Sequence, residues 1–172
     1  MKRILVLSDS HSGLSFMRRC IRAVKPDVMI HLGDYFDDGE TMAQENPNVR
    51  NHQVPGNCDR YRMIRYEPEV RCYPVGGVKF YMTHGHLHNV KTNRHQLLLE
   101  ARKMDAQVVL YGHTHVPATE YFSNEDKPFY LFNPGSISSG RGSYGILTLT
   151  EGQEPLFSQK STRFDSLMPQ GD

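Results

Sequence analysis

The chain has little of several features that would point to specialised classes of protein. Its 172 residues include only three cysteines, Cys20, Cys58 and Cys72, which are too few and too scattered for a disulfide framework. No apolar run approaches the length of a membrane-spanning helix, and the run near the N-terminus is too short for a secretion signal. The formal net charge is only +1, so the sequence predicts neither a nucleic-acid nor a membrane partner. These absences favour a cytoplasmic protein.

Length and composition predict a single domain over residues 1–172. The chain is long enough to bury a sizeable core, and its 38% hydrophobic and 23% charged residues are ordinary for a globular protein. No linker-like composition divides the chain, and no internal repeat is visible. We expect only the last residues, from about Met168, to fray.

Apolar runs and turn signals predict the strands. Four runs in the first two thirds end in polar residues or glycine, which is typical of buried strands, at 4–7, 28–32, 51–54 and 107–111. The pair Gly76-Gly77 predicts a hairpin turn between strands at 69–75 and 78–83. After Pro117 we expect an antiparallel region without helices, with a turn at 124–126 and strands at 119–121, 129–131 and 146–149.

Amphipathic spacing predicts helices between the early strands. A helix over 14–24 follows the first strand, and Ser12 is its expected N-cap. A second helix over 93–104 carries Asn93 and Gln96 at the spacing of a capping box. Because the first two strands are separated by a helix, they are expected to pair in parallel.

Polar clusters follow five of the strand ends. In an open parallel sheet, ligands bind at the carboxyl ends of the strands, so these clusters are expected to meet at one edge. They hold two aspartates, one asparagine and four histidines, and no cysteine fits the set. The seven side chains are Asp9, His11, Asp34, Asn57, His84, His113 and His115.

These donors suit a hard-to-borderline cation and differ from those of a structural zinc site. We favour Mn²⁺, with Fe, Zn²⁺ or Ni²⁺ as alternatives. One metal ion needs about four to six ligands, so seven donors fit two divalent metal ions that share a bridging carboxylate. Two metals roughly 3.5–4 Å apart can bind both sides of a phosphoryl group and generate a hydroxide between them.

Each cluster by itself also has a simple structural interpretation. Asp9 and Asp34 alone could be helix caps or turn formers, His84 a core histidine, and residues 112–115 a turn. The occurrence of five clusters at five strand ends favours a metal centre over these interpretations. Of the remaining histidines, two are candidates for lining the pocket and three are interpreted as core or surface residues: His86 and His88, and His31, His52 and His95.

Taken in order, the clusters resemble those of the calcineurin-like metallophosphoesterase superfamily. The chain is most similar to the small YfcE-like phosphodiesterases, which also carry Gly-Asn-Cys-Asp. The motifs here are Asp9-Ser10-His11, Gly33-Asp34-Tyr35-Phe36-Asp37, Gly56-Asn57-Cys58-Asp59, Thr83-His84-Gly85-His86 and Gly112-His113-Thr114-His115. The resemblance implies an α/β fold in which two mixed β-sheets pack as a sandwich flanked by helices, giving four layers.

The resemblance also implies a role for each donor. Two metal ions would be held around a bridging Asp34, one by Asp9, His11, Asp34 and His115, and the other by Asn57, His84 and His113. Asn57 would also orient the phosphate, so the catalytic residues would be Asn57, Asp34 and His84. Asp37 would be an outer partner of the ligands, and residues 133–136 would form a turn near the metal edge.

The implied reaction is hydrolysis of a small phosphodiester substrate by a metal-bridging hydroxide, with no covalent enzyme intermediate. Many members carry a histidine after Gly-Asn, where this chain has Cys58. A thiol has a higher pKa and weaker hydrogen bonding than an imidazole, so diesters with acidic leaving groups are expected to react best. The alternatives within the enzyme class are a phosphomonoesterase and a dinucleoside-polyphosphate hydrolase.

A protein-binding scaffold is the alternative from another class. The retromer subunit with this fold resembles a metallophosphoesterase but has lost part of its site. Every expected ligand position in this chain carries a metal-competent side chain, which favours the enzyme. The sequence is also compatible with a homo-oligomer. Substrate specificity is expected to come from cap-like loops around residues 35–50, 60–68 and 86–93, the first containing a turn at 37–39 and a short helix over 40–46.

Overall fold

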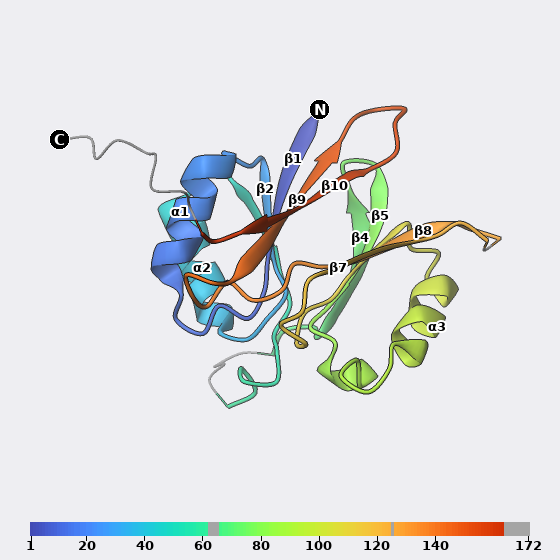
Figure 1. Ribbon diagram of the computed structural model, residues 1–172, viewed down its shortest axis with the longest axis horizontal. Helices are drawn as coiled ribbons and strands as arrows, with labels where there is room; N and C mark the ends of the chain where they lie inside the picture. Colours follow the sequence, from blue (N-terminus) through green and yellow to red (C-terminus); the bar gives the residue numbers. More distant parts are fainter. Residues whose placement is uncertain (62–65, 125, 164–172) are drawn as a thin grey trace.

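Two five-stranded sheets pack face to face in the computed structural model, which describes residues 1–61, 66–124 and 126–163 (Figure 1). The first sheet has the strand order β10-β9-β1-β2-β3, with bounds β1 (Lys2–Leu7), β2 (Val28–His31), β3 (Arg50–Gln53), β9 (Ser143–Leu149) and β10 (Leu156–Ser161). The second has the order β4-β5-β6-β8-β7, with bounds β4 (Val70–Val75), β5 (Val78–Thr83), β6 (Val108–Leu110), β7 (Ala118–Phe122) and β8 (Phe129–Asn133). The expected fold class, two mixed sheets with helices outside, is confirmed.

Helices cover the outer face of each sheet (Figure 1). Two of them, α1 (Leu14–Val24) and α2 (Phe36–Glu45), pack on the first sheet, and α3 (His95–Lys103) packs on the second. A short 3₁₀ helix, η1 (His86–His88), follows β5. No helix in the described residues is long and apolar enough to cross a membrane.

The central strands are buried on both faces, which explains their continuous apolar runs. In β1, Ile4 faces the core between the two sheets, whereas Leu5 faces the core under α1 and α2. The core between the sheets joins residues of both, including Ile30 from β2 and Phe80 and Phe132 from the second sheet. Burial of these side chains therefore holds the two sheets in a fixed relation to each other.

Parallel pairing brings the carboxyl ends of several strands to the same edge. In the first sheet β2 is parallel to both β1 and β3, and in the second sheet β6 is parallel to both β5 and β8. The loops that follow β1, β2 and β3 accordingly lie together at the lower edge of the first sheet in Figure 1. The parallel pairing expected for the first two strands is confirmed.

Two expectations about the strands need correction. The sequence did not predict β10, because it is a half-exposed edge strand with little apolar alternation. The last third is not purely antiparallel, because β8 pairs in parallel with β6 as well as antiparallel with β7. The hairpin at Gly76-Gly77 is confirmed, with β4 and β5 paired up to Val75 and Val78.

The predicted starts of the helices were less accurate than their positions. Residues 37–39, expected to be a turn, form the beginning of α2. Gly13 rather than Ser12 is the N-cap of α1, and Arg94 rather than Asn93 is the N-cap of α3, although Asn93 Oδ1 accepts a hydrogen bond from the backbone N–H of His95 at 3.0 Å. Two expectations, the fraying from Met168 and part of the loop at 60–68, fall outside the described residues, as does the middle of the turn at 124–126.

Candidate metal centre

The structure brings all seven predicted side chains to one place. Ligand atoms of four of them lie within 4.8 Å of one another: Asp9, His11, Asp34 and His115. The remaining three adjoin this group through His84, whose Nε2 lies 3.4 Å from Asp34 Oδ1 and 3.2 Å from Asn57 Oδ1. The ring of His113 is centred 5.0 Å from that of His84. Strands from both sheets therefore supply the site.

Asp9 is fully buried, and only one of its carboxylate oxygens is satisfied. The Ser8 hydroxyl and the backbone N–H of His113 donate to Oδ2, at 2.5 and 3.1 Å. Oδ1 accepts no hydrogen bond, although His115 Nε2 is 3.0 Å away and His84 Nε2 is 3.8 Å away. Burial opposes ionisation, but these imidazoles lower the pKa of Asp9. A cation would satisfy this buried anionic oxygen.

The hydrogen bonding of His84 leaves a lone pair in the centre of the site. Its Nδ1 lies 2.7 Å from the backbone oxygen of Leu32, and because a carbonyl only accepts, Nδ1 must carry the proton. With that proton alone on the ring, Nε2 presents a lone pair to oxygens of Asn57, Asp34 and Asp9. A second proton or a cation must lie among these atoms, because lone pairs alone would repel one another.

Asp34 stands between the two groups of donors. Its Oδ1 accepts a hydrogen bond from the backbone N–H of Cys58 at 2.9 Å and faces His84. Its Oδ2 lies 3.7 Å from Nε2 of His11. Each oxygen of the carboxylate therefore faces a histidine from a different group, which is an arrangement suited to bridging two cations.

The last two histidines lie on different sides of the centre. The ring of His115 is 5.5 Å from that of His11, whereas His113 is beside His84. Burial and the nearby His84 lower the pKa of His113 to about 4, so its imidazole is neutral at pH 7 and retains a lone pair. The carboxylate of Asp9 raises the pKa of His115.

Several of these residues have a strained backbone. A positive φ is rare for residues other than glycine and costs of order 1–3 kcal/mol where the surroundings enforce it. Five of the seven donors have one: Asp9 (53°), His11 (42°), Asp34 (57°), His113 (66°) and His115 (59°). Such clustering is typical of functional sites.

Two motif glycines permit close approach between loops. A Cβ on Gly56 would collide with the carboxylate of Asp34, and one on Gly112 would collide with the side chains of Ser8 and Asp9. The glycines therefore let neighbouring backbone segments press against the two aspartates.

Asp59 is a positioning residue whose role the sequence did not reveal. It is fully buried, and its Oδ1 accepts hydrogen bonds from the backbone N–H groups of Tyr35 and Phe36, both at 2.8 Å. Its Oδ2 accepts another from the N–H of Gly56 at 2.7 Å. Asp59 thereby caps α2 and ties the loop after β2 to the loop after β3. Its place in the Gly-Asn-Cys-Asp motif was the only available signal.

Asp38 occupies the supporting position that was expected for Asp37. The buried Asp38 accepts hydrogen bonds from the Ser10 hydroxyl at 2.7 Å and from the backbone N–H of Ser12 at 2.9 Å. It thereby holds the loop between β1 and α1, whereas Asp37 lies in the first turn of α2 and is exposed. The supporting contact therefore comes from the residue after the motif aspartate.

The segment 133–136 braces two of the site loops. The Asn133 amide donates to the backbone oxygen of Gly112 at 3.0 Å and to the Thr114 hydroxyl at 3.1 Å. The Ser136 hydroxyl donates to the backbone oxygen of Asp9 at 2.9 Å. The segment lies near the metal edge as expected, but it is the end of β8 followed by irregular chain instead of a turn, and its hydrogen bonds define its role.

The other histidines separate clearly. His86 lies beside the site, with its ring centred 5.5 Å from that of His84. His88 does not line the pocket, because it is buried in a network with the Tyr81 hydroxyl at 2.9 Å and the Glu100 carboxylate at 3.0 Å. Three histidines were expected to be structural. His31 lies in the core, His52 lies beside Tyr73, and His95 is at the surface.

The variant Asp59→Asn is predicted to weaken both the fold and the metal centre. The new side chain keeps one oxygen acceptor but turns an NH₂ group toward backbone N–H donors, so at least one buried donor loses its partner, which costs about 1–3 kcal/mol. We expect about 10–100-fold weaker Mn²⁺ binding, as for other outer-shell partners. Urea unfolding and calorimetric titration measure both effects. Asp37→Asn is the control, and equal losses in both variants would contradict the positioning role of Asp59.

Comparisons with known proteins agree with this geometry. The family model described as the calcineurin-like phosphoesterase superfamily domain matches residues 1–152. The probable metallophosphoesterase YsnB of Bacillus subtilis is 32% identical over 154 residues, with 85% of this chain and 83% of YsnB covered. Phosphodiesterase YfcE of Escherichia coli K12 is 27% identical over 172 residues, with 86% of this chain and 88% of YfcE covered.

Solved structures show the same architecture. A conserved Streptococcus pneumoniae protein described as a predicted phosphoesterase aligns with a TM-score of 0.72 and 27% identity, covering 94% of this chain and 90% of its own. Vps29 of Entamoeba histolytica, solved in complex with zinc, aligns with a TM-score of 0.67, with 93% of this chain and 99% of Vps29 covered. At 19% identity the second likeness concerns the fold alone. Because the region matched by the family model contains all five motifs, this chain belongs to the calcineurin-like phosphoesterase superfamily and has the metal-dependent phosphoesterase machinery of that family.

Proposed function

We propose that this protein is a phosphodiesterase that uses two divalent cations, with Mn²⁺ as the preferred pair. Asp9, His11, Asp34 and His115 would hold one cation, and Asn57, His84 and His113 the other, with Asp34 shared. The observation that carries the proposal is the position of Asp34, because its two oxygens face histidines of the two different groups. The unpaired Asp9 Oδ1 and the bare Nε2 of His84 support the same assignment.

When bound, two such cations supply Lewis-acid stabilisation of phosphoryl oxygens and lower the pKa of water between them. The residues of the chain position the reaction. Asn57 is exposed at the mouth of the site, so its amide can donate to a phosphoryl oxygen while its Oδ1 faces inward. His84 is unsuited to donate a proton to a substrate through Nδ1, because the Nδ1–H group donates its hydrogen bond to the backbone oxygen of Leu32.

Cys58 supports a preference for diesters with acidic leaving groups. Partial burial and the neighbouring Asp34 carboxylate raise the pKa of its thiol to about 11. The thiol is therefore neutral at pH 7 and a weak acid, which makes it a poor donor to an alkoxide leaving group. A monoester or a dinucleoside polyphosphate is the alternative substrate class. The name of the relative YfcE, a phosphodiesterase, agrees with the diester assignment.

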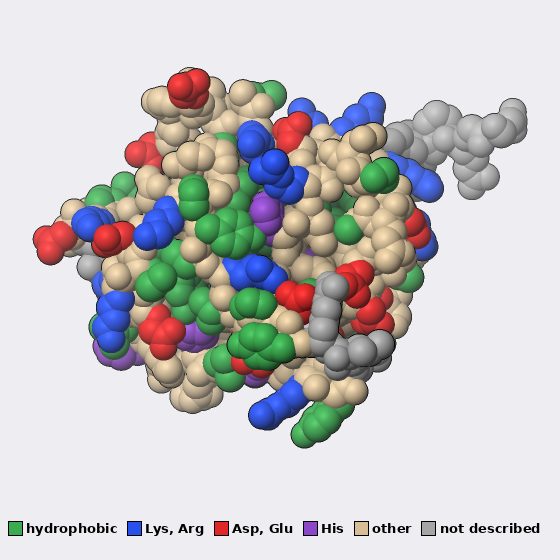
Figure 2. All heavy atoms as spheres, turned by 180° about the vertical axis from the view of Figure 1, so that it is seen from behind, with side chains coloured by type: hydrophobic (Ala, Val, Ile, Leu, Met, Phe, Trp, Pro, Cys, Tyr) green, Lys and Arg blue, Asp and Glu red, His purple; other side chains and the backbone are tan. Residues whose placement is uncertain are grey.

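The proposed partner is a small phosphodiester, and the proposed location is the cytoplasm. On the face seen in Figure 2, lysine and arginine side chains are interspersed with acidic ones instead of forming a single field. This distribution supports a small substrate over a nucleic-acid strand. A homo-oligomer stays a prediction.

The scaffold alternative is supported by the likeness to Vps29, but only at the level of the fold. An intact donor set at seven positions, five of them with a strained backbone, argues for retained chemistry. We therefore place the enzyme ahead of the scaffold.

Asp34→Asn tests the enzyme directly. Removing one anionic oxygen from the shared position should lower the Mn²⁺-dependent rate on an aryl phosphodiester by at least about 100-fold, since even outer-shell changes cost about 10–100-fold. Initial rates and metal content are measured together. Asp105→Asn is the control, because Asp105 is exposed and lies just after α3, the helix that covers the second sheet. An unchanged rate in Asp34→Asn, or a wild-type protein that binds no metal, would refute the proposal.

Cys58→His tests why diesters are preferred. A histidine at this position adds a group able to protonate the leaving oxygen, and general acids contribute about 10²–10⁴-fold. We expect aryl monoester hydrolysis to rise at least about tenfold relative to aryl diester hydrolysis. Comparing kcat/KM for the two substrates gives the ratio, and an unchanged ratio would show that Cys58 does not set the preference.

A further inference from the structure

A second cavity opens directly beside the metal centre. Its volume is about 520 Å³, and its walls come from the loop between β8 and β9 and from β10. His115 and Ser136 form the wall that it shares with the metal centre. His115 Nε2 lies 3.0 Å from Asp9 Oδ1, and the Ser136 hydroxyl donates to the backbone of Asp9, so a ligand in this cavity would adjoin the reacting group.

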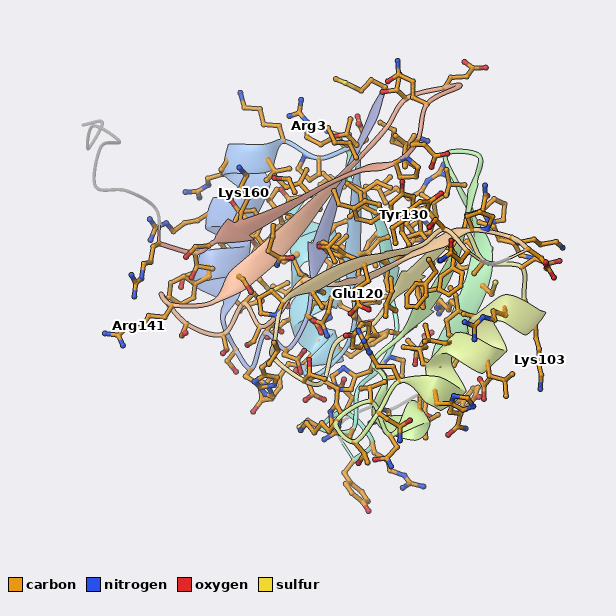
Figure 3. The ribbon with its side chains drawn as sticks, turned by 45° about the vertical axis from the view of Figure 1, so that its right-hand side comes forward. Arg3, Lys103, Glu120, Tyr130, Arg141 and Lys160 are labelled. Carbon is orange, nitrogen blue, oxygen red and sulfur yellow. The ribbon has the colours of Figure 1, made fainter. Side chains whose placement is uncertain are left out.

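The chemistry of the cavity is cationic and hydroxyl-rich. Arg141 and Lys160 contribute positive charge, and none of the lining residues is an aspartate or glutamate. Within the described part of the chain, neither cation is paired with a carboxylate. Both lie on the side of the molecule opposite Lys103, with Arg141 on the loop between β8 and β9 and Lys160 apart from it on β10 (Figure 3). Serine hydroxyls fill much of the remaining wall, including those of Ser138 and Ser139.

The cavity has a supported wall. The hydroxyl of Thr162, a residue that is only 2% exposed, donates to the backbone oxygen of Ser139 at 2.8 Å. The backbone N–H of Thr162 donates to Gly142 at 2.9 Å, and that of Ser143 donates to Ser136 at 2.8 Å. These bonds fasten the loop between β8 and β9 to the end of β10, so its hydroxyls are positioned before a ligand arrives.

We propose that this cavity is a subsite for a second phosphoryl group of the substrate. The preferred substrate would be a phosphodiester whose scissile phosphate lies at the metal centre while another phosphate lies against the serine-rich loop between β8 and β9, in the positive field of Arg141 and Lys160 at the rim of the cavity. Charge-assisted hydrogen bonds from such groups are the usual means of phosphate recognition. The inference rests on the proposed diesterase function and names the class of substrate that this site selects.

The test uses two matched diesters and the Mn²⁺-loaded protein. The substrates are the p-nitrophenyl ester of thymidine 5′-phosphate and the same compound with an added 3′-phosphate. We expect about tenfold higher kcat/KM for the second, a ratio that falls at high salt because exposed charges are screened. In the double variant Arg141→Gln/Lys160→Gln the ratio should approach one while hydrolysis of the first diester persists. Lys103→Gln, which alters a distant exposed lysine, should keep the wild-type ratio.

A binding measurement separates this inference from the proposed reaction. Calorimetry compares thymidine 3′,5′-bisphosphate with thymidine 5′-phosphate on the same three proteins. Tighter binding of the bisphosphate, lost in the double variant alone, supports the subsite even if no diester is hydrolysed, in which case only the proposed function fails. Equal binding of the two nucleotides by the wild-type protein, or a preference that survives in the double variant, overturns the subsite.

Discussion

Among the hydrogen bonds that join the two sheets at the metal centre, one sets the orientation of His84. Leu32 follows β2 of the first sheet, His84 follows β5 of the second, and the carbonyl of the former binds Nδ1 of the latter at 2.7 Å. This contact fixes the tautomer and turns a bare nitrogen toward the oxygens of Asp34 and Asn57. If the sheets shifted, the donors from one sheet would no longer meet those from the other. The packed core between the sheets is thus a condition for the chemistry.

The loops around this bond hold one another in unfavourable conformations. Positive φ angles at Asp9, Asp34 and His115 persist because neighbouring groups over-determine them. Asp59 fastens the loop after β2 from the side of β3, and Ser136 fastens the loop after β1 from β8. Backbone hydrogen bonds therefore position the donors before any cation binds, which lowers the cost of organising the site.

The sequence was sufficient for the part of this arrangement that depends on local pattern. Continuous apolar runs marked the buried strands, and polar residues directly after them marked the edge where the donors meet. The sequence was insufficient where partners are distant along the chain. The start of α2 depends on Asp59, which lies 23 residues beyond Phe36, and the choice of Asp38 over Asp37 depends on Ser10. Neither contact leaves a periodic signal, and the same holds for the exposed edge strand β10.

The central claim is that the donors around Asp34 hold two neighbouring cations. Titration of the metal-free protein with Mn²⁺, followed by electron paramagnetic resonance, tests it most directly. Two equivalents per chain and the spectrum of an exchange-coupled pair are the predicted result, because a shared carboxylate places the ions roughly 3.5–4 Å apart. A single bound equivalent, or two ions with uncoupled spectra, would contradict a bridged centre.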